Sequence, residues 1–159
     1  MEFRKLVGDF AAGLGVMDIS FDEDGIARLT ADDMVVAFME VPERRSLLIW
    51  SEVATPPPEK LAQLYKLLLE AMFMGRATQG ATFSCENDKI YLHRMDALVD
   101  LEPESLSKIV EEFLNLVEKW RDVINTFRAD ETGTETASSE EAVEPLSFGL
   151  GGPAGFMQV

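Results

Sequence analysis

Residues 32–54 read DDMVVAFMEVPERRSLLIWSEVA, and this stretch decides the fold. Its β-branched and aromatic residues predict two strands, over about 34–41 and 46–53, joined by residues 42–45. Both alternations of each strand are largely apolar, whereas a sheet with one wet face alternates apolar and polar side chains. We therefore expect both faces of the sheet to be covered, one by the protein's own helices and the other by something else.

Further helices and strands flank this tract. Helical spacing and strand alternation predict helices over residues 3–14, 58–74 and 102–127, and further strands over 26–30, 81–86 and 89–95. Asn87-Asp88 is typical of a tight turn between the last two strands. The order helix, three strands, helix, two strands, helix predicts an α+β fold over residues 1–128, with an antiparallel sheet packed with helices.

The charge of the chain limits the classes of partner. Of its 159 residues, 29 are Asp or Glu and only 14 are Lys or Arg, which gives a formal net charge of −15. Nucleic acids and anionic membrane surfaces bind clustered Lys and Arg, so we expect neither as a partner. The negative charge either serves solubility or favours a basic partner.

The sequence also indicates a cellular compartment. The stretch MEFRKLVGDFAAGLG has no long uncharged apolar run, so we expect no signal peptide, and no later stretch is long enough to span a bilayer. Cys85 is the only cysteine, which rules out an internal disulfide and fits a reducing compartment. We expect a cytoplasmic protein.

The helix predicted over residues 58–74 is apolar on more than one side. Leu61, Leu64 and Leu68 belong to one stripe, and other apolar residues lie on its flanks. A domain of this size has too little interior to surround a helix, so the flanks predict contact with a second copy of the chain. We expect the interface of this homodimer to include Leu67, Leu69, Ala71, Phe73 and Met74.

Few residues of this chain suggest catalysis. His93 is the only histidine, and no nucleophile, phosphate loop or zinc ligand set accompanies it, so we expect it at a surface or a contact. Residues 20–31 lack the first acid and the final glutamate of a calcium loop. Cys85 is expected to be a small buried hydrophobe. We predict no enzyme, metal or cofactor; an enzyme that uses Asp22 and Asp24 is an alternative.

The last part of the chain differs in composition from the rest. No Lys or Arg follows Arg128, and the segment is acidic and rich in Thr, Ser and Gly, so we expect a disordered tail over residues 129–159. Its end, PLSFGLGGPAGFMQV, is apolar. This end is expected either to be disordered or to dock on an apolar groove of the chain or of a partner.

Several stretches together resemble one family. They are the acidic turn FDEDGIARLTADD, the strand tract ending in SEVATPPP, the stretch LAQLYKLLLEAMFMGRATQGATFSCENDKIYLHRMD, and the closing helix with Trp120 before Arg121. They resemble the class I type III secretion chaperones of the CesT (Tir chaperone) family over about residues 1–127. The resemblance is one of pattern along the chain and includes no catalytic motif.

The resemblance implies a small acidic cytoplasmic homodimer without enzymatic activity. Such chaperones bind the N-terminal region of a secreted effector in extended form, keep it competent for export and help deliver it to the secretion ATPase. In this family the middle helix and nearby strands form the dimer contact, which adds Phe83 to the interface. A dimeric regulator or scaffold of the same architecture, without an export role, is the alternative.

The resemblance also implies a client groove along the sheet and the first helix. Glu40 and Glu52 share one parity of the two central strands, so we expect that parity to reach solvent at its rim and to hold the client. The opposite parity is the alternative. The predicted client contacts are Met34, Val36, Phe38, Leu48, Trp50, Ile26 and Phe10.

Overall fold

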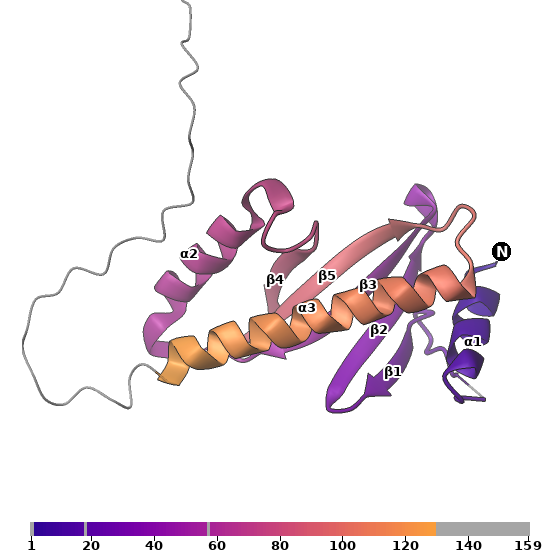
Figure 1. Ribbon diagram of the computed structural model, residues 1–159, viewed down its shortest axis with the longest axis horizontal. Coiled ribbons are helices and arrows are strands. Elements are labelled where there is room, and N and C mark those ends of the chain that lie inside the picture. Colours follow the sequence, from indigo (N-terminus) through magenta and orange to yellow (C-terminus); the bar gives the residue numbers. More distant parts are fainter. Residues whose placement is uncertain (1, 18, 57, 130–159) are drawn as a thin grey trace, which may run out of the picture.

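The computed structural model describes residues 2–17, 19–56 and 58–129, and it confirms the predicted α+β fold and order of elements (Figure 1). The helices and strands are α1 (Phe3–Gly13), β1 (Ala27–Ala31), β2 (Met34–Val41), β3 (Ser46–Ala54), α2 (Leu61–Met72), β4 (Thr82–Glu86), β5 (Lys89–Ala97) and α3 (Pro103–Ala129). Short 3-10 turns are η1 (Pro42–Arg44), η2 (Pro58–Lys60) and η3 (Phe73–Gly75). The predicted tail lies outside the described residues, except for Ala129 at the end of α3.

The strands form one antiparallel sheet in the order β1-β2-β3-β5-β4. Consecutive strands pair as hairpins, with one exception: β3 and β4 do not pair. β5 lies between them and pairs with both, so β4 is at the edge of the sheet. Asn87 and Asp88 turn β4 into β5 with φ values of 49° and 59°. This left-handed geometry is that of a two-residue hairpin turn and confirms the turn predicted there.

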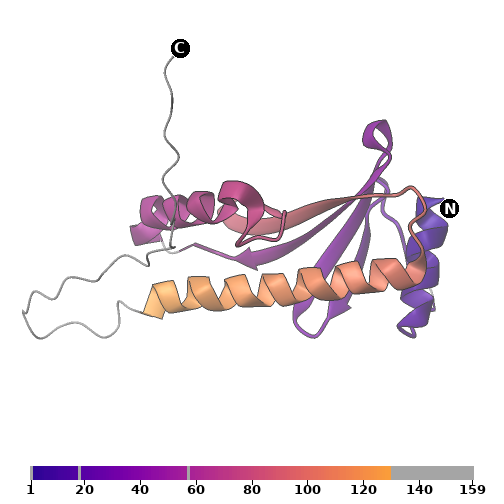
Figure 2. The same ribbon diagram turned by 45° about the horizontal axis from the view of Figure 1, so that its top comes forward.

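The helices pack against one face of the sheet, called the helix face here (Figures 1 and 2). The ring of Phe10 in α1 lies 5.9 Å from that of Phe38 in β2, and Trp120 of α3 meets Phe83 of β4 edge-on at 5.0 Å. Leu64 and Leu68 of α2 join the same core at the β4 end. The largest fully buried side chains of this core are Leu6, Phe38, Leu47, Ile49, Leu64, Ile90, Leu92, Leu106, Phe113 and Ile124.

The register of β2 on β3 determines which side chains reach this core. Val41 pairs with Ser46 across the connection of residues 42–45, and Phe38 consequently pairs with Ile49. Residues paired in this way point to the same face, so even positions of β2 share a face with odd positions of β3. Phe38 and Ile49 are both 0% exposed beneath the helices.

This register corrects the predicted client face. That face combines Met34, Val36 and Phe38 of β2 with Leu48 and Trp50 of β3, but the two groups point to opposite sides of the sheet. Met34, Val36 and Phe38 are 8%, 1% and 0% exposed and belong to the core, whereas Leu48 and Trp50 are half-buried on the other side. A connection with an even number of residues reverses the parity between two strands, so equal parity does not mean a shared face.

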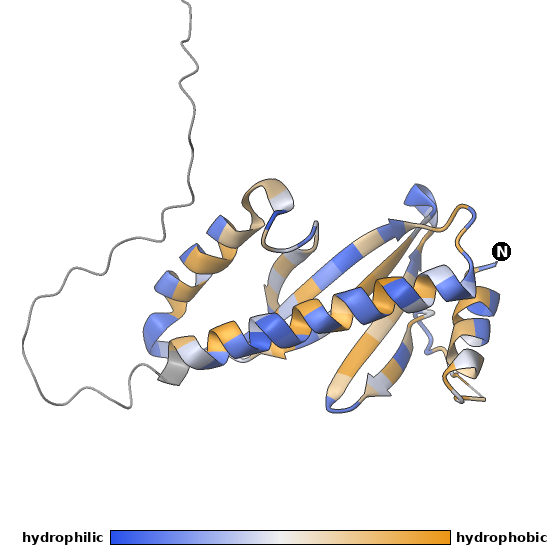
Figure 3. Cartoon of the chain, in the orientation of Figure 1, coloured by the Kyte–Doolittle hydropathy of each residue, from blue (hydrophilic) through white to orange (hydrophobic). Residues whose placement is uncertain are grey.

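The described chain covers α2 on one side only. Leu64 and Leu68 are buried against the sheet, while Leu69 is 64% exposed. In the turn after the helix, Phe73 and Met74 are 77% and 71% exposed. Apolar residues therefore occupy both the core side and the solvent side of this part of the chain (Figure 3).

α3 runs along the sheet from α1 to the start of α2 (Figure 2). Arg121 Nη1 lies 3.2 Å from Asp33 Oδ2 in the turn between β1 and β2, and Lys60 Nζ lies 5.3 Å from the ring centre of Phe127. The apolar stripe of this helix faces the core. Within residues 2–17, 19–56 and 58–129, no helix is both long and apolar enough to cross a bilayer.

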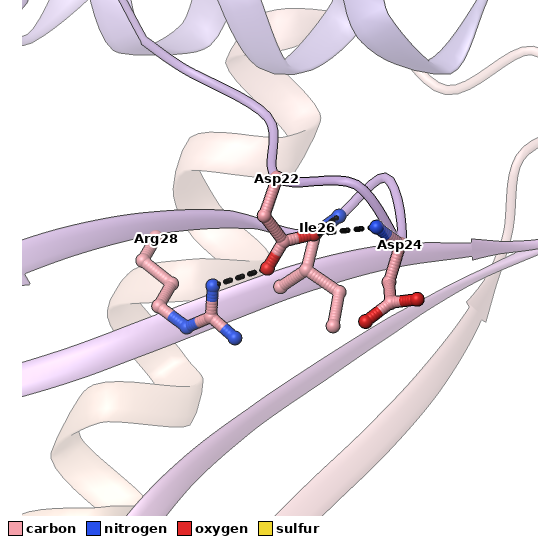
Figure 4. A network of polar contacts seen from close by, with 4 residues as sticks. All are labelled: Asp22, Asp24, Ile26 and Arg28. Carbon is pink, nitrogen blue, oxygen red and sulfur yellow. Dashed lines mark hydrogen bonds and ion pairs between the residues drawn. The ribbon is translucent and has the colours of Figure 1, made fainter.

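The acidic turn before β1 is organised by Asp22 (Figure 4). Asp22 Oδ1 accepts hydrogen bonds from the backbone N–H of Asp24 (3.1 Å) and of Ile26 (2.8 Å), and Oδ2 accepts one from Arg28 at 2.6 Å. The Arg28 bond, followed by the backbone bonds, holds the pKa of Asp22 below its usual value. A carboxylate occupied in this way stabilises the turn, which argues against a catalytic pair of Asp22 and Asp24.

Phe38→Ala should lower the free energy of unfolding by about 3–5 kcal/mol, because it leaves a cavity in the core. Trp50→Ala should lower it by less than half as much, because Trp50 is half-buried on the opposite face. Urea unfolding followed by far-UV circular dichroism measures both changes. Equal losses would contradict the assignment of the two faces.

The Asp22 turn should make stability depend on pH at the acidic end. A carboxyl with a lowered folded-state pKa stabilises the fold above its usual pKa of 3.8, and this contribution is lost as the pH falls through the folded-state value. The difference in urea midpoint between the wild-type protein and Asp22→Asn should therefore have its maximum value at pH 7 and decrease below pH 4. Asp24→Asn is the matched control, and a difference that does not change with pH would refute this account.

Candidate functional site

The sheet face opposite the helix face is the candidate site and is called the open face here. No described helix covers it, as Figures 1 and 2 show from two directions. A shallow groove of about 940 Å3 lies on it and includes residues from all five strands and from the turn before β1. Trp50 and Leu48 of β3 line the groove, together with Val35, Ala37, Tyr91 and His93 from the neighbouring strands.

The strand pairings arrange the side chains of the open face in rows across the sheet. Trp50 stands in the central row, which reads Arg28, Ala37, Trp50, His93 and Thr82 from β1 to β4. Ala37 is only 4% exposed, although no helix covers it, since it stands between the larger Arg28 and Trp50. The small side chain of Ala37 therefore forms a low point beside the indole ring.

The two rows beside the central one differ in polarity. On one side the row is apolar, with Met39, Leu48 and Met95 from β2, β3 and β5. Met95 is 42% exposed, which is unusual for a methionine inside a sheet. On the other side the row contains Glu52 and Tyr91, with Ser84 next to Tyr91. The open face thus has an apolar side, where Met39 and Met95 lie beside the groove, and a polar side.

The charged groups of the groove are partly paired. Lys89 Nζ lies 2.7 Å from Glu52 Oε2, and this hydrogen bond raises the pKa of Lys89. Asp24 and Glu86 have no ion-pair partner in the described part of the chain, so the groove retains negative charge at both ends. Burial lowers the pKa of His93, which leaves its imidazole neutral at pH 7 and adds no positive charge.

The structure separates the predicted client residues into two groups. Ile26, Leu48 and Trp50 line the groove, whereas Phe10 is 4% exposed and packs on Phe38 with the other core residues. Phe10 is thus unavailable as a groove residue in this fold. Val35 and Met39 belong to the alternative parity, which the pairings place on the open face, whereas sequence reasoning missed Tyr91, His93 and Met95 as open-face residues.

The predicted interface residues of α2 and η3 are divided between two sides. Leu69, Phe73 and Met74 are exposed, whereas Leu67 and Ala71 are half-buried and pack against the core. Phe83 lies elsewhere: it is half-buried in β4, where its ring packs on Trp120 and its backbone N–H donates to Met72 Sδ at 3.1 Å. The exposed apolar residues of this surface therefore come from α2 and η3.

Cys85 does not have the environment that was expected. It is exposed near the end of the edge strand β4, so the expectation of a small buried hydrophobe is wrong. Its alternation does point it to the helix face, where Cys85 Sγ lies 3.3 Å from Tyr65 Oη, but α2 leaves this end of β4 exposed, and Cys85 also lines the groove. Among the residues that the structure describes, no three or more His, Cys, Asp or Glu side chains are grouped to hold a metal ion.

Solved structures share this fold. A chain of the ExsC–ExsE complex matches with a TM-score of 0.67 at 20% identity, over 78% of this chain and 97% of its own length. A chain of the HopA1–SchA chaperone–effector complex matches with a TM-score of 0.63 at 17% identity, over 76% of this chain and 93% of its own length. A chain of the complex of the Yersinia pestis type III secretion chaperone SycH with a stable fragment of YscM2 matches with a TM-score of 0.59 at 18% identity, over 75% of this chain and 99% of its own length.

The same fold occurs in YbjN from E. coli, a protein proposed to regulate transcription, with a TM-score of 0.58 at 12% identity over 80% of this chain and 94% of YbjN. At such identities these likenesses show the fold. No curated protein sequence matches this chain significantly. The sequence model of one family does match, over residues 5–121, and confirms the resemblance. The chain belongs to the Tir chaperone protein (CesT) family.

Proposed function

We propose that this protein is a cytoplasmic type III secretion chaperone that binds the N-terminal segment of an effector in extended form on the open face and keeps it competent for secretion. The observation that carries the proposal is the open face itself. An apolar row of Met39, Leu48 and Met95 and the indole of Trp50 lie there without cover from any described helix. Membership of a chaperone family supports a protein client for this face.

The chemistry of the groove suits an extended client. Alternate side chains of an extended segment point to one side and can enter the apolar row, and the outer edge of β1 beyond its bridge at Ala27 can offer backbone hydrogen bonds. Burial of apolar area contributes about 25 cal/mol per Å2, reduced by the entropy lost when the client becomes ordered. The flexible thioethers of Met39 and Met95 adapt to side chains of different shape. The unpaired Asp24 and Glu86 favour basic residues in the client.

We also propose a homodimer that forms through α2. Leu69, Phe73 and Met74 give the outer side of α2 and η3 an apolar surface with no cover in the described chain. A two-fold axis beside this helix would bury the same surface of both copies. The open face of each copy would remain available to the client, and delivery to the secretion ATPase would follow, as in the family.

An alternative function is that of a dimeric regulator or scaffold with no export role. The likeness to YbjN favours it, since that fold match is about as good as the match to SycH. The two functions differ in the partner. A chaperone retains an extended, otherwise unfolded segment, whereas a regulator contacts a folded surface.

Affinity purification of the tagged protein from its native host, with mass spectrometry and limited proteolysis, tests the proposal. We expect a co-purifying protein of which only the N-terminal segment resists protease. A folded partner protected elsewhere, or no partner under conditions that induce secretion, would contradict the chaperone function.

Leu48→Glu and Trp50→Glu should each weaken binding of that segment at least tenfold, because both place a charge in the apolar part of the groove. Isothermal titration with the protected segment measures the affinity. Val99→Glu is the matched control: Val99 is 58% exposed in the loop before α3, outside this groove. Unchanged affinity in the two groove variants would remove the open face as the client site.

Phe73→Glu combined with Met74→Glu should convert the dimer to a folded monomer, because four carboxylates would meet across the two-fold axis. Sedimentation equilibrium gives the mass, and circular dichroism checks the fold. The control again is Val99→Glu, which should remain a dimer. A double variant that still sediments as a dimer would show that α2 is not the interface.

A further inference from the structure

We propose that the apolar end of this chain, residues 145–159, occupies the open-face groove whenever no client is bound. The inference rests on the proposed function, since it assigns a resident occupant to the proposed client site. The groove is shallow and uncovered in the described chain, with Leu48 and Trp50 as its large apolar side chains, and the same chain continues for thirty residues, 130–159, past the end of α3.

The sequence of this end matches the chemistry of the groove. Residues 145–159, PLSFGLGGPAGFMQV, contain no Asp, Glu, Lys or Arg. All charged side chains beyond α3 belong to residues 130–144, which carry six acids and no base. A segment without charged side chains can approach Asp24 and Glu86 without repulsion, and the acidic stretch before it can remain in water.

The spacing of its apolar residues also fits the rows of the open face. Leu146, Phe148 and Leu150 alternate with Ser147 and Gly149, so an extended chain directs all three to one side. Their span is about 13 Å at 3.3 Å per residue, and three adjacent strands span about 10 Å at 4.8 Å per step. The segment can therefore cross β2, β3 and β5 and cover the row of Met39, Leu48 and Met95.

The place where α3 ends makes this docking reachable. α3 ends beside the start of α2, where the ring of Phe127 lies 5.3 Å from Lys60 Nζ. η2 and α2 follow closely on β3, whose Glu52 lines the groove, so the chain leaves the helix at that end of the sheet. The fifteen residues 130–144 extend to about 50 Å at most, enough to pass around the sheet.

Attachment to the same chain makes even weak docking effective. A linker of fifteen residues gives an effective concentration of about a millimolar, so a segment with millimolar intrinsic affinity is already half bound. A client then competes with the segment. The apparent dissociation constant of the client is its intrinsic value divided by the fraction of molecules in which the groove is free. A basic client gains contacts with Asp24 and Glu86 that the uncharged segment lacks, which allows displacement.

The two tryptophans of the chain allow a direct test. Trp50 stands in the groove, while Trp120 is 5% exposed in the core, so acrylamide quenching of the full-length, client-free protein reports mainly on Trp50. Leu146→Ser, Phe148→Ser and Leu150→Ser, combined in the full chain, should raise the quenching constant at least twofold. A synthetic peptide of residues 145–159 should reverse the rise. Ser147→Ala, the matched control, should leave it unchanged.

Equal quenching of the wild-type protein and the triple variant, with no effect of the peptide, would overturn the inference. So would a triple variant that alters only the oligomeric state, since the segment would then contact the α2 surface. Neither readout involves a client. Failure of docking therefore leaves the chaperone function intact, and docking without any co-purifying effector would leave this inference standing while the chaperone function fails. If both hold, the triple variant binds the protected segment several-fold more tightly than the wild-type protein.

Discussion

The pairing of β2 with β3 is the constraint on which the rest of the structure depends. A connection of four residues sets Val41 opposite Ser46, and the alternation of an extended chain then assigns every side chain of both strands to one face. A slip of one residue would put Phe38 and Trp50 on the same face, so that either Phe38 would turn outward or Trp50 would turn toward the helices. The same register determines both the core and the groove. A change in the pairing of β2 with β3 would therefore disrupt both.

The two faces of the sheet contribute unequally to the stability of the fold. On the helix face, packing of α1 and α3 on β2 and β3 supplies the hydrophobic stabilisation. Side chains on the open face contribute little to that core and are free to vary with a ligand. This explains how a domain of modest size tolerates exposed apolar groups such as Val35 and Met95.

Apolar periodicity predicted the type and order of the elements correctly, because each long element has one buried stripe. The Asn87-Asp88 turn was also predictable, because two adjacent residues determine its geometry. The site was predicted less well. The face of Phe38 was misassigned, although the even length of the connection after β2 would have corrected it. Tyr91 and His93 were missed for a different reason: β5 reaches β3 only after α2 and β4, and no local pattern encodes that pairing. Cys85 was misjudged because alternation does not reveal where an edge strand runs past its covering helix.

α3 also fixes the shape of the groove from behind. It packs on α1 near one end, forms an ion pair to the β1–β2 turn through Arg121, and meets the start of α2 at Phe127. A sheet braced at these separate points cannot easily change its twist, so the groove has its form before any ligand arrives. If the proposed client binds here, the loss of conformational entropy falls almost wholly on the client. Binding would then show a large negative heat-capacity change and an unfavourable entropy.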